Sequence, residues 1–245
     1  PTWRWSGRHL FWRFVLPSTN ARLKKTERDI RFMSEELVNA DIRLAHTLPS
    51  EFYTDAGLFA AQRDAIKSAW QFVGSNEQFT SAIAPLPHLD ALLDEPLIRT
   101  EDGEDVRVLS NVCTHRGMVM CHEATNKKTI QCPYHGRTFG CDGRLKHMPG
   151  FEEAANFPTA ADHLISFPLR TWNGFEFMSL DAEMDFKTLL GPVEERIGWF
   201  LNGLEYDPSR DRDWDISTHW MLYVDNYLEG FHIPFVHPEL NDALD

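Results

Sequence analysis

The chain has 245 residues, of which 42% are hydrophobic and 25% are charged, a composition typical of a globular protein with a packed core. Its formal net charge of −13 argues against nucleic acid as the main partner, because a phosphate backbone would be repelled. We expect no membrane span, since no apolar run approaches about 18 residues, and no secretory signal. Four cysteines do not suggest a disulfide scaffold, so we expect a reducing, cytoplasmic location.

Residues 1–32 differ in composition from the remainder. They carry eight Lys/Arg against two acidic residues and include Trp3, Trp5 and Trp12. One interpretation is a basic aromatic arm that touches a membrane surface or a partner. The other, which we favour, is that the segment is not native protein, because a translation start placed upstream of Met33 would produce such a break.

Residues 33–75 are predicted to be mainly helical. Within 57–73, apolar residues recur three or four positions apart, which is the period of one helix face. The residues in this pattern are Leu58, Ala61, Ala65, Ala69 and Phe72.

Residues 76–182 are predicted to form a small all-β module. Three hairpins are expected over 97–112, 138–145 and 164–180, and their turns contain Gly103, Gly143 and Gly174. Helical character returns at 185–204, and a strand or helix is expected to start near 216–222. We therefore divide the chain into segments 1–32, 33–75, 76–182 and 183–245.

Two short motifs within the β module bring cysteine and histidine together. Cys113-Thr114-His115 is followed by Cys132-Pro133-Tyr134-His135. Two thiolates and two imidazoles are the ligand set of a [2Fe–2S] cluster in which histidines bind one of the irons. Gly117 and Gly136 allow the backbone to approach closely, with N–H groups that could point toward the sulfides. Structural zinc is the competing interpretation, although its usual half-sites are C-x₂₋₄-C and H-x₃₋₅-H.

Residues 113–139 resemble the Rieske centre of ring-hydroxylating oxygenases and their monooxygenase relatives. Respiratory Rieske proteins carry an additional cysteine in each loop, where this chain has Met118 and Tyr134. The family usually has Trp after His-Gly, where this chain has Arg137. The two remaining cysteines, Cys121 and Cys141, are expected to be thiols without a role.

A second motif lies near the end of the chain. If 223–231 is helical, Asn226, Glu229 and His232 share one face, and Pro234 then lets His237 return toward His232. Two imidazoles are two-thirds of the 2-His-1-carboxylate triad of non-haem Fe(II) oxygenases.

By resemblance, His232 and His237 ligate a mononuclear Fe(II). Glu229 is the carboxylate that links this iron to a neighbouring subunit's cluster histidine, and Glu229 and Asn226 are the predicted catalytic residues. The third ligand of the family is an Asp more than about a hundred residues further on, so we expect a truncated chain. The carboxylates that follow His237 have no family reason to replace it; they are Glu239, Asp242 and Asp245.

The resemblance implies an α+β fold, in which the all-β Rieske module is inserted in an incomplete helix-grip (START-like) catalytic domain. It implies the large subunit of an aromatic-ring dioxygenase or a quaternary-amine monooxygenase. A reductase using NAD(P)H, with or without a ferredoxin, would supply electrons for O₂-dependent hydroxylation of a small organic substrate, and the subunits would form a homotrimer. The alternatives are an electron-carrier ferredoxin of Rieske type and a non-catalytic zinc protein.

Overall fold

The computed structural model describes residues 3–5, 39, 41–201, 203–210, 212 and 214–244. The contrast between a basic segment 1–32 and the remainder therefore lies outside the described residues, apart from strand β1 (Trp3–Trp5). From residue 39 on, the chain forms two compact units. One comprises Arg63–Trp214, and the other comprises the described residues up to Gln62 together with those from Asp215.

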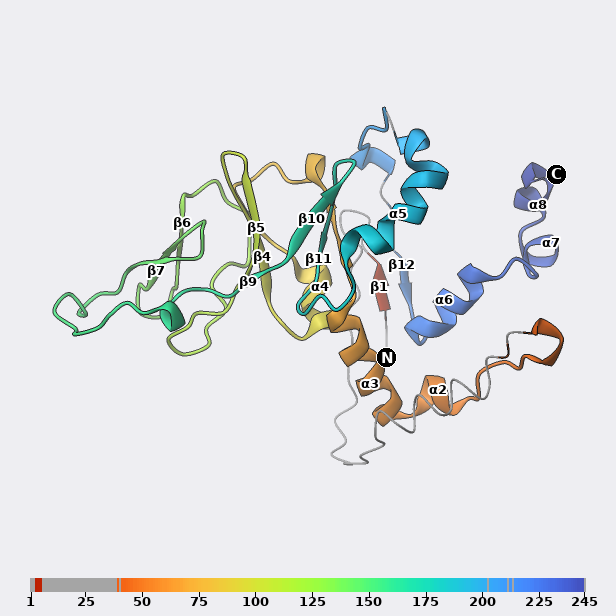
Figure 1. Ribbon diagram of the computed structural model, residues 1–245, viewed down its shortest axis with the longest axis horizontal. Helices are drawn as coiled ribbons and strands as arrows, with labels where there is room; N and C mark the ends of the chain where they lie inside the picture. Colours follow the sequence, from red (N-terminus) through yellow and green to blue (C-terminus); the bar gives the residue numbers. More distant parts are fainter. Residues whose placement is uncertain are drawn as a thin grey trace. The chain divides into compact units, whose positions relative to one another are not determined.

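The unit Arg63–Trp214 is built mainly from antiparallel strands in three small sheets (Figure 1). The first has the order β3-β4-β5-β9, the second β10-β11-β2 and the third β6-β7-β8. Their bounds are β2 (Gln71–Ser75), β3 (Ile83–Pro85), β4 (Leu97–Asp102), β5 (Asp105–Ser110), β6 (Thr129–Gln131), β7 (Thr138–Gly140), β8 (Leu145–His147), β9 (Ser166–Phe167), β10 (Leu169–Trp172) and β11 (Phe175–Met178).

All three predicted hairpins are confirmed. β4 pairs with β5, β7 with β8 and β10 with β11, each in antiparallel register. Gly103, Gly143 and Gly174 have φ of 65°, 77° and 82°, a left-handed conformation that glycine adopts at little cost. The third hairpin begins later than expected, because residues 166–167 form the separate strand β9, which pairs with β5.

Both units also contain helices. Besides α2 (Glu51–Thr54), α3 (Ala56–Ser68), α4 (Pro87–Leu93) and α5 (Phe186–Ile197), the chain forms α6 (Trp220–Leu228), α7 (Ile233–Val236) and α8 (Pro238–Leu244). Short 3₁₀ turns lie at η1 (Ile42–Leu44), η2 (Asn76–Gln78), η3 (Ala160–Asp162), η4 (Gly198–Leu201) and η5 (Pro208–Arg210), and β12 spans Trp214–Ile216. The mixture of helices and antiparallel sheets confirms the α+β class.

Two predicted helix boundaries were wrong. The helix expected over 57–73 ends at Ser68, and residues 71–75 form β2, which pairs with β11. A strand partner decides the conformation here, because sheet hydrogen bonds and burial of Val73 outweigh the helical spacing of Phe72. The helix expected over 185–204 ends as α5 at Ile197 and continues as η4.

One hydrophobic core lies between the first and third sheets. It contains Ile83, Ile98, Leu109, Ile130 and Phe139, all nearly inaccessible to solvent. Cys113, Cys132 and Cys141 belong to the same cluster. The loops that carry the cysteine–histidine motifs are therefore anchored in the best-packed part of the unit.

None of the described helices has the length and apolar character required to cross a lipid bilayer.

Candidate metal centres

The two cysteine–histidine loops fold in the same way. In the first, the N–H of Cys113 donates to Met118 O at 2.8 Å, and the N–H of Gly117 donates to Cys113 O at 3.0 Å. In the second, the N–H of Cys132 donates to Arg137 O and the N–H of Gly136 to Cys132 O, at the same two distances. The two loops thus present matching turns, each closed by a glycine.

The two glycines give each turn its conformation. Gly117 and Gly136 have φ of 70° and 73°, so both turns need the left-handed conformation. Their N–H groups donate to the cysteine carbonyls inside the turns, and backbone N–H donation to the sulfides stays a prediction. A side chain at Gly136 would also approach the ring of Pro149 to 3.3 Å.

Within this site, the two sulfur donors lie together, and so do the two imidazoles. The thiols of Cys113 and Cys132 are close enough to interact electrostatically, and both residues are only 2% exposed. The rings of His115 and His135 are 4.8 Å apart at their centroids, and Tyr134 stacks on His135 at 3.8 Å. His135 is exposed and His115 is partly so. The site therefore has a buried sulfur end and an accessible imidazole end.

This separation fits a binuclear cluster. In a Rieske cluster two cysteines bind one iron and two histidines the other, so the four donors need not converge on one point. Among the described residues, no group of three His, Cys, Asp or Glu side chains is placed to hold one metal ion. The buried Nδ1 of His115 has no hydrogen-bond partner, which is what a nitrogen reserved for a metal shows.

Electrostatics differ between the two ends of the site. Burial raises the pKa of the Cys113 thiol, and the adjacent thiol of Cys132 raises it further. Desolvation lowers the pKa of His115, and the neighbouring His135 adds to this effect. Neutral imidazole is the form that binds metal, so the histidine end favours ligation, whereas the thiols need an incoming cation to ionise.

The remaining thiols are Cys121 and Cys141, and burial raises the pKa of both. Cys141 belongs to the same core cluster as Cys113 and Cys132. That neither thiol has a role stays a prediction.

The second motif does not lie on one helix face as predicted. α6 ends at Leu228, and Glu229 has extended φ and ψ of −112° and 156°. Gly230 follows, so the helical register that would have aligned Asn226 with His232 is lost. Pro234 does not break a helix either, because it occupies the first turn of α7, where its missing N–H costs nothing.

The structure nevertheless brings three of the predicted residues together. Glu229 Oε1 lies 2.5 Å from His232 Nδ1, and this contact lowers the pKa of the Glu229 carboxyl. The rings of His232 and His237 are 5.4 Å apart at their centroids. Asn226 is exposed on α6, and no contact joins it to these residues. Glu239 and Asp242 are exposed on α8, whereas Asp245 lies outside the described residues.

A contact that holds α6 was not predicted from the sequence. Tyr53 Oη donates to Asp225 Oδ2 at 2.5 Å, although the two residues are 172 positions apart. The ring of His219, just before α6, packs edge-on against Tyr53 at 6.0 Å and Phe59 at 5.5 Å. Only the tertiary structure could reveal these pairs, because neither forms a recognisable motif.

Comparison with known proteins agrees with this geometry. The model of the Rieske [2Fe-2S] domain matches residues 69–158. The carnitine monooxygenase oxygenase subunit of Escherichia coli K12 is 28% identical over 87% of this chain and 58% of its own. The chloroplastic choline monooxygenase of Spinacia oleracea is 27% identical over 79% of this chain and 45% of its own.

The chain therefore contains a Rieske [2Fe-2S] domain, and over most of its length it is similar to oxygenase subunits of monooxygenases. The aligned regions of the curated relatives extend well beyond the matched Rieske domain. The chain spans about half the length of those relatives, at 45% and 58%.

Solved structures show the same fold. The quaternary ammonium Rieske monooxygenase CntA, in complex with L-carnitine, has a TM-score of 0.66 at 22% identity, covering 82% of this chain and 58% of that one. Naphthalene 1,2-dioxygenase from Rhodococcus sp. has a TM-score of 0.59 at 23% identity, covering 69% of this chain and 39% of that one.

Proposed function

We propose that this chain is the oxygenase component of a multi-component Rieske system that hydroxylates a small organic substrate with O₂. One observation carries the proposal: a buried pair of cysteines and an accessible pair of histidines meet in two matching loops. Such an arrangement suits a [2Fe–2S] cluster with a mixed shell, and residues 69–158 match the Rieske [2Fe-2S] domain.

In this proposal Cys113 and Cys132 hold one iron and His115 and His135 the other. When bound, the cluster supplies one-electron transfer at a potential raised by its neutral imidazole ligands. The chain contributes the environment: the core around the thiols excludes water from the sulfur end, and Tyr134 holds the ring of His135 by stacking.

His232 and His237 are proposed as ligands of a mononuclear Fe(II). Glu229 accepts the Nδ1 proton of His232, which leaves Nε2 of that ring for the metal and fixes its orientation. When bound, such an iron supplies open coordination positions for O₂. Asn226 is proposed to act near the substrate, and Glu229 to link this iron to a partner subunit's cluster.

The proposed partners follow from the family. An NAD(P)H-dependent reductase, with or without a ferredoxin, supplies the electrons, and a closed homotrimer brings the cluster of one subunit to the iron of the next. We also propose that 76–182 is the Rieske domain and 183–245 the start of the catalytic domain. Four free thiols suit a reducing compartment such as the cytoplasm.

For the substrate, we propose a quaternary amine. The support is that the curated relatives quoted above are named for choline and carnitine. The aligned part of those relatives runs past the Rieske domain, which favours an oxygenase over a Rieske-type ferredoxin, whose chain would be little more than the β module.

Anaerobic, iron-replete preparation of the full chain tests the proposal. We expect a reddish-brown Rieske spectrum with about two acid-labile sulfides per chain, and about three irons if the second site also fills. Two irons only, with His232→Ala leaving the count unchanged, would favour the ferredoxin. A colourless protein without labile sulfide would refute the cluster and the oxygenase together, and zinc in its place would establish the non-catalytic alternative.

A further inference from the structure

The residue after the second cluster loop is a buried cation. Arg137 is 4% exposed, and its backbone carbonyl accepts the N–H of Cys132, which closes the loop. Its guanidinium lies over the rings of Phe139 at 5.8 Å and Phe157 at 5.6 Å. Burying an arginine side chain costs free energy unless its charge is compensated, so the groups around Arg137 indicate its role.

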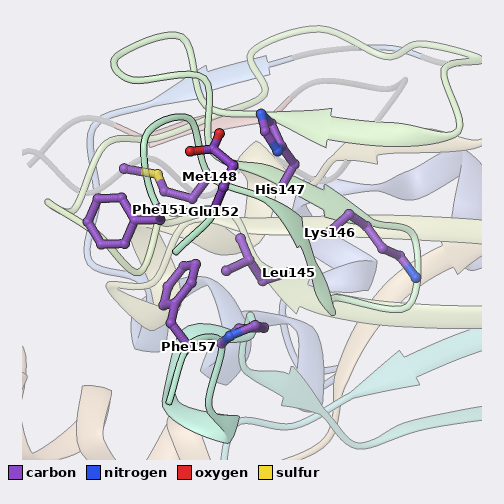
Figure 2. Close-up of a pocket in the computed structure, with 8 residues that line it drawn as sticks. Leu145, Lys146, His147, Met148, Phe151, Glu152 and Phe157 are labelled. Carbon is purple, nitrogen blue, oxygen red and sulfur yellow. The ribbon is translucent and has the colours of Figure 1, made fainter. Parts of the chain in front are cut away.

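One of the aromatic neighbours lines a pocket of about 160 Å³. Figure 2 shows Phe157 near Leu145, with Met148 and Phe151 among the other lining residues. The rings of Phe151 and Phe157 are 5.0 Å apart, so the ring under the guanidinium has an aromatic neighbour of its own.

The charge partner of Arg137 is Asp162, at the end of η3. Arg137 Nη2 donates to Asp162 Oδ1 at 2.5 Å, while Asp162 Oδ2 accepts from both the N–H and the Oγ1 of Thr159 at 2.8 Å. The backbone carbonyl of Asp162 accepts from Thr114 Oγ1 at 2.8 Å. Since Thr114 lies in the first loop and Arg137 closes the second, Asp162 is hydrogen-bonded to both loops.

The charge of Arg137 lies beside the site, because the residue is two positions from His135 and its backbone carbonyl is hydrogen-bonded to Cys132. The guanidinium Nε is buried without a hydrogen-bond partner, so only one side of its charge is neutralised by the carboxylate of Asp162. The remaining positive charge acts in surroundings of low polarity, where charge interactions are stronger than in water.

We propose that Arg137 and Asp162 form a positioning pair that sets the reduction potential of the cluster while bracing its two loops. Reduction adds one negative charge to the cluster. The buried cation stabilises that charge and raises the potential, whereas the carboxylate opposes it. The inference rests on the cluster proposed above, but concerns residues that are not its ligands.

Removing the positive charge in one variant and the negative charge in another distinguishes an effect of charge on the potential from an effect of lost structure. In the anaerobically prepared full chain, Arg137→Met should shift the midpoint potential downward, and Asp162→Asn should shift it upward. Arg137→Lys, which retains the charge, should return the potential toward the wild-type value. The readout is a spectroelectrochemical titration of the visible and electron paramagnetic resonance signals, with labile sulfide measured in each sample.

Lys146→Met is the matched control, because Lys146 is an exposed cation of the same module, paired with Asp142 at 3.5 Å. Its potential should equal that of the wild type. Shifts in the same direction for Arg137→Met and Asp162→Asn, or no shift in either, would overturn the proposal. If Arg137→Met loses its cluster, the comparison of Arg137→Lys with Asp162→Asn decides. Absence of a cluster in the wild type would instead refute the proposed function.

Discussion

The loops around Cys113 and Cys132 grow out of a sheet core, whereas His232 and His237 lie at the two ends of the four-residue helix α7. In the first region the backbone of each loop is closed by hydrogen bonds, and the thiols are buried. In the second, Phe231 and Phe235 beside the histidines are each 87% exposed. The cluster site thus has both of its ligand pairs in place. The second site has two imidazoles with one carboxylate beside them.

The difference teaches that ligand type alone does not make a site rigid. The cluster loops derive their geometry from backbone hydrogen bonds and from packing against the core. The second motif depends on a local contact between Glu229 and His232 and on the anchoring of α6. We expect metal binding to change the first region little and to order the second more strongly.

The largest expected effect is that a ligand substitution empties one metal site and leaves the other filled. Cys113→Ser should abolish the Rieske spectrum and the labile sulfide, because one thiolate ligand is lost. His232→Ala should leave both intact and remove only mononuclear iron. Iron, sulfide and visible absorption measured on the same samples check this. Loss of the cluster in His232→Ala would show that the two regions are not independent.

Breaking a buried ion pair should destabilise the cluster region strongly. Arg99 and Glu176 are both buried and form two hydrogen bonds of 2.7 and 2.8 Å. Glu176→Gln should cost about 3 kcal/mol, because Arg99 loses its buried charge partner and keeps only the more exposed Glu101, at 2.7 Å. Urea unfolding followed by circular dichroism measures the loss.

The control for that loss is Asp105→Asn, which removes the partner of Arg107 in an exposed pair at 3.0 Å. Its effect should stay below about 1 kcal/mol. Equal costs for the two substitutions would mean that the buried pair contributes little more than a surface pair, and the contrast in rigidity would lose its support.

A smaller effect is expected for Tyr53→Phe. The substitution removes the hydrogen bond to Asp225 while keeping the ring, which should cost about 1 kcal/mol. Hydrogen exchange should become faster in α6 and the following segment and stay unchanged in β4 and β5. Faster exchange in those strands, or none in α6, would contradict the anchoring role.

The smallest effect is a pH dependence near α6. Burial lowers the pKa of His219 from the ordinary 6.5, so the unfolded chain takes up a proton more readily than the folded one. The stability held above pH 6.5 is therefore lost as the pH falls through that value. His219→Asn, which keeps an N-cap acceptor for Met221, should flatten the dependence of the urea midpoint on pH. An unchanged pH profile in that variant would remove His219 as its source.

Local signals were sufficient for much of the β module. Glycines at the turns located all three hairpins, and Cys113, His115, Cys132 and His135 could be chosen because cysteine next to histidine is rare at such spacing. The assignment of β2 failed because residues 71–75 take their conformation from β11, which is about a hundred positions away. Periodicity reports only neighbours in sequence.

The second motif was predicted less well for a similar reason. Spacing placed Asn226, Glu229 and His232 on one helix, but Gly230 and the first turn of α7 interrupt it. The pairs Arg137–Asp162 and Tyr53–Asp225 were invisible, since each depends on the meeting of distant segments. The sequence signals thus identify donor chemistry, whereas the residues that orient those donors emerge only from tertiary structure.

The buried sulfurs and the accessible imidazole rings also determine the order in which an assembled cluster would be lost. Under the proposed ligation, acid or a chelator in the surrounding solvent reaches His135 long before it reaches either thiolate. Damage would begin with protonation of an imidazole and release of the iron it holds, and the sulfur-bound half would be the last part to leave.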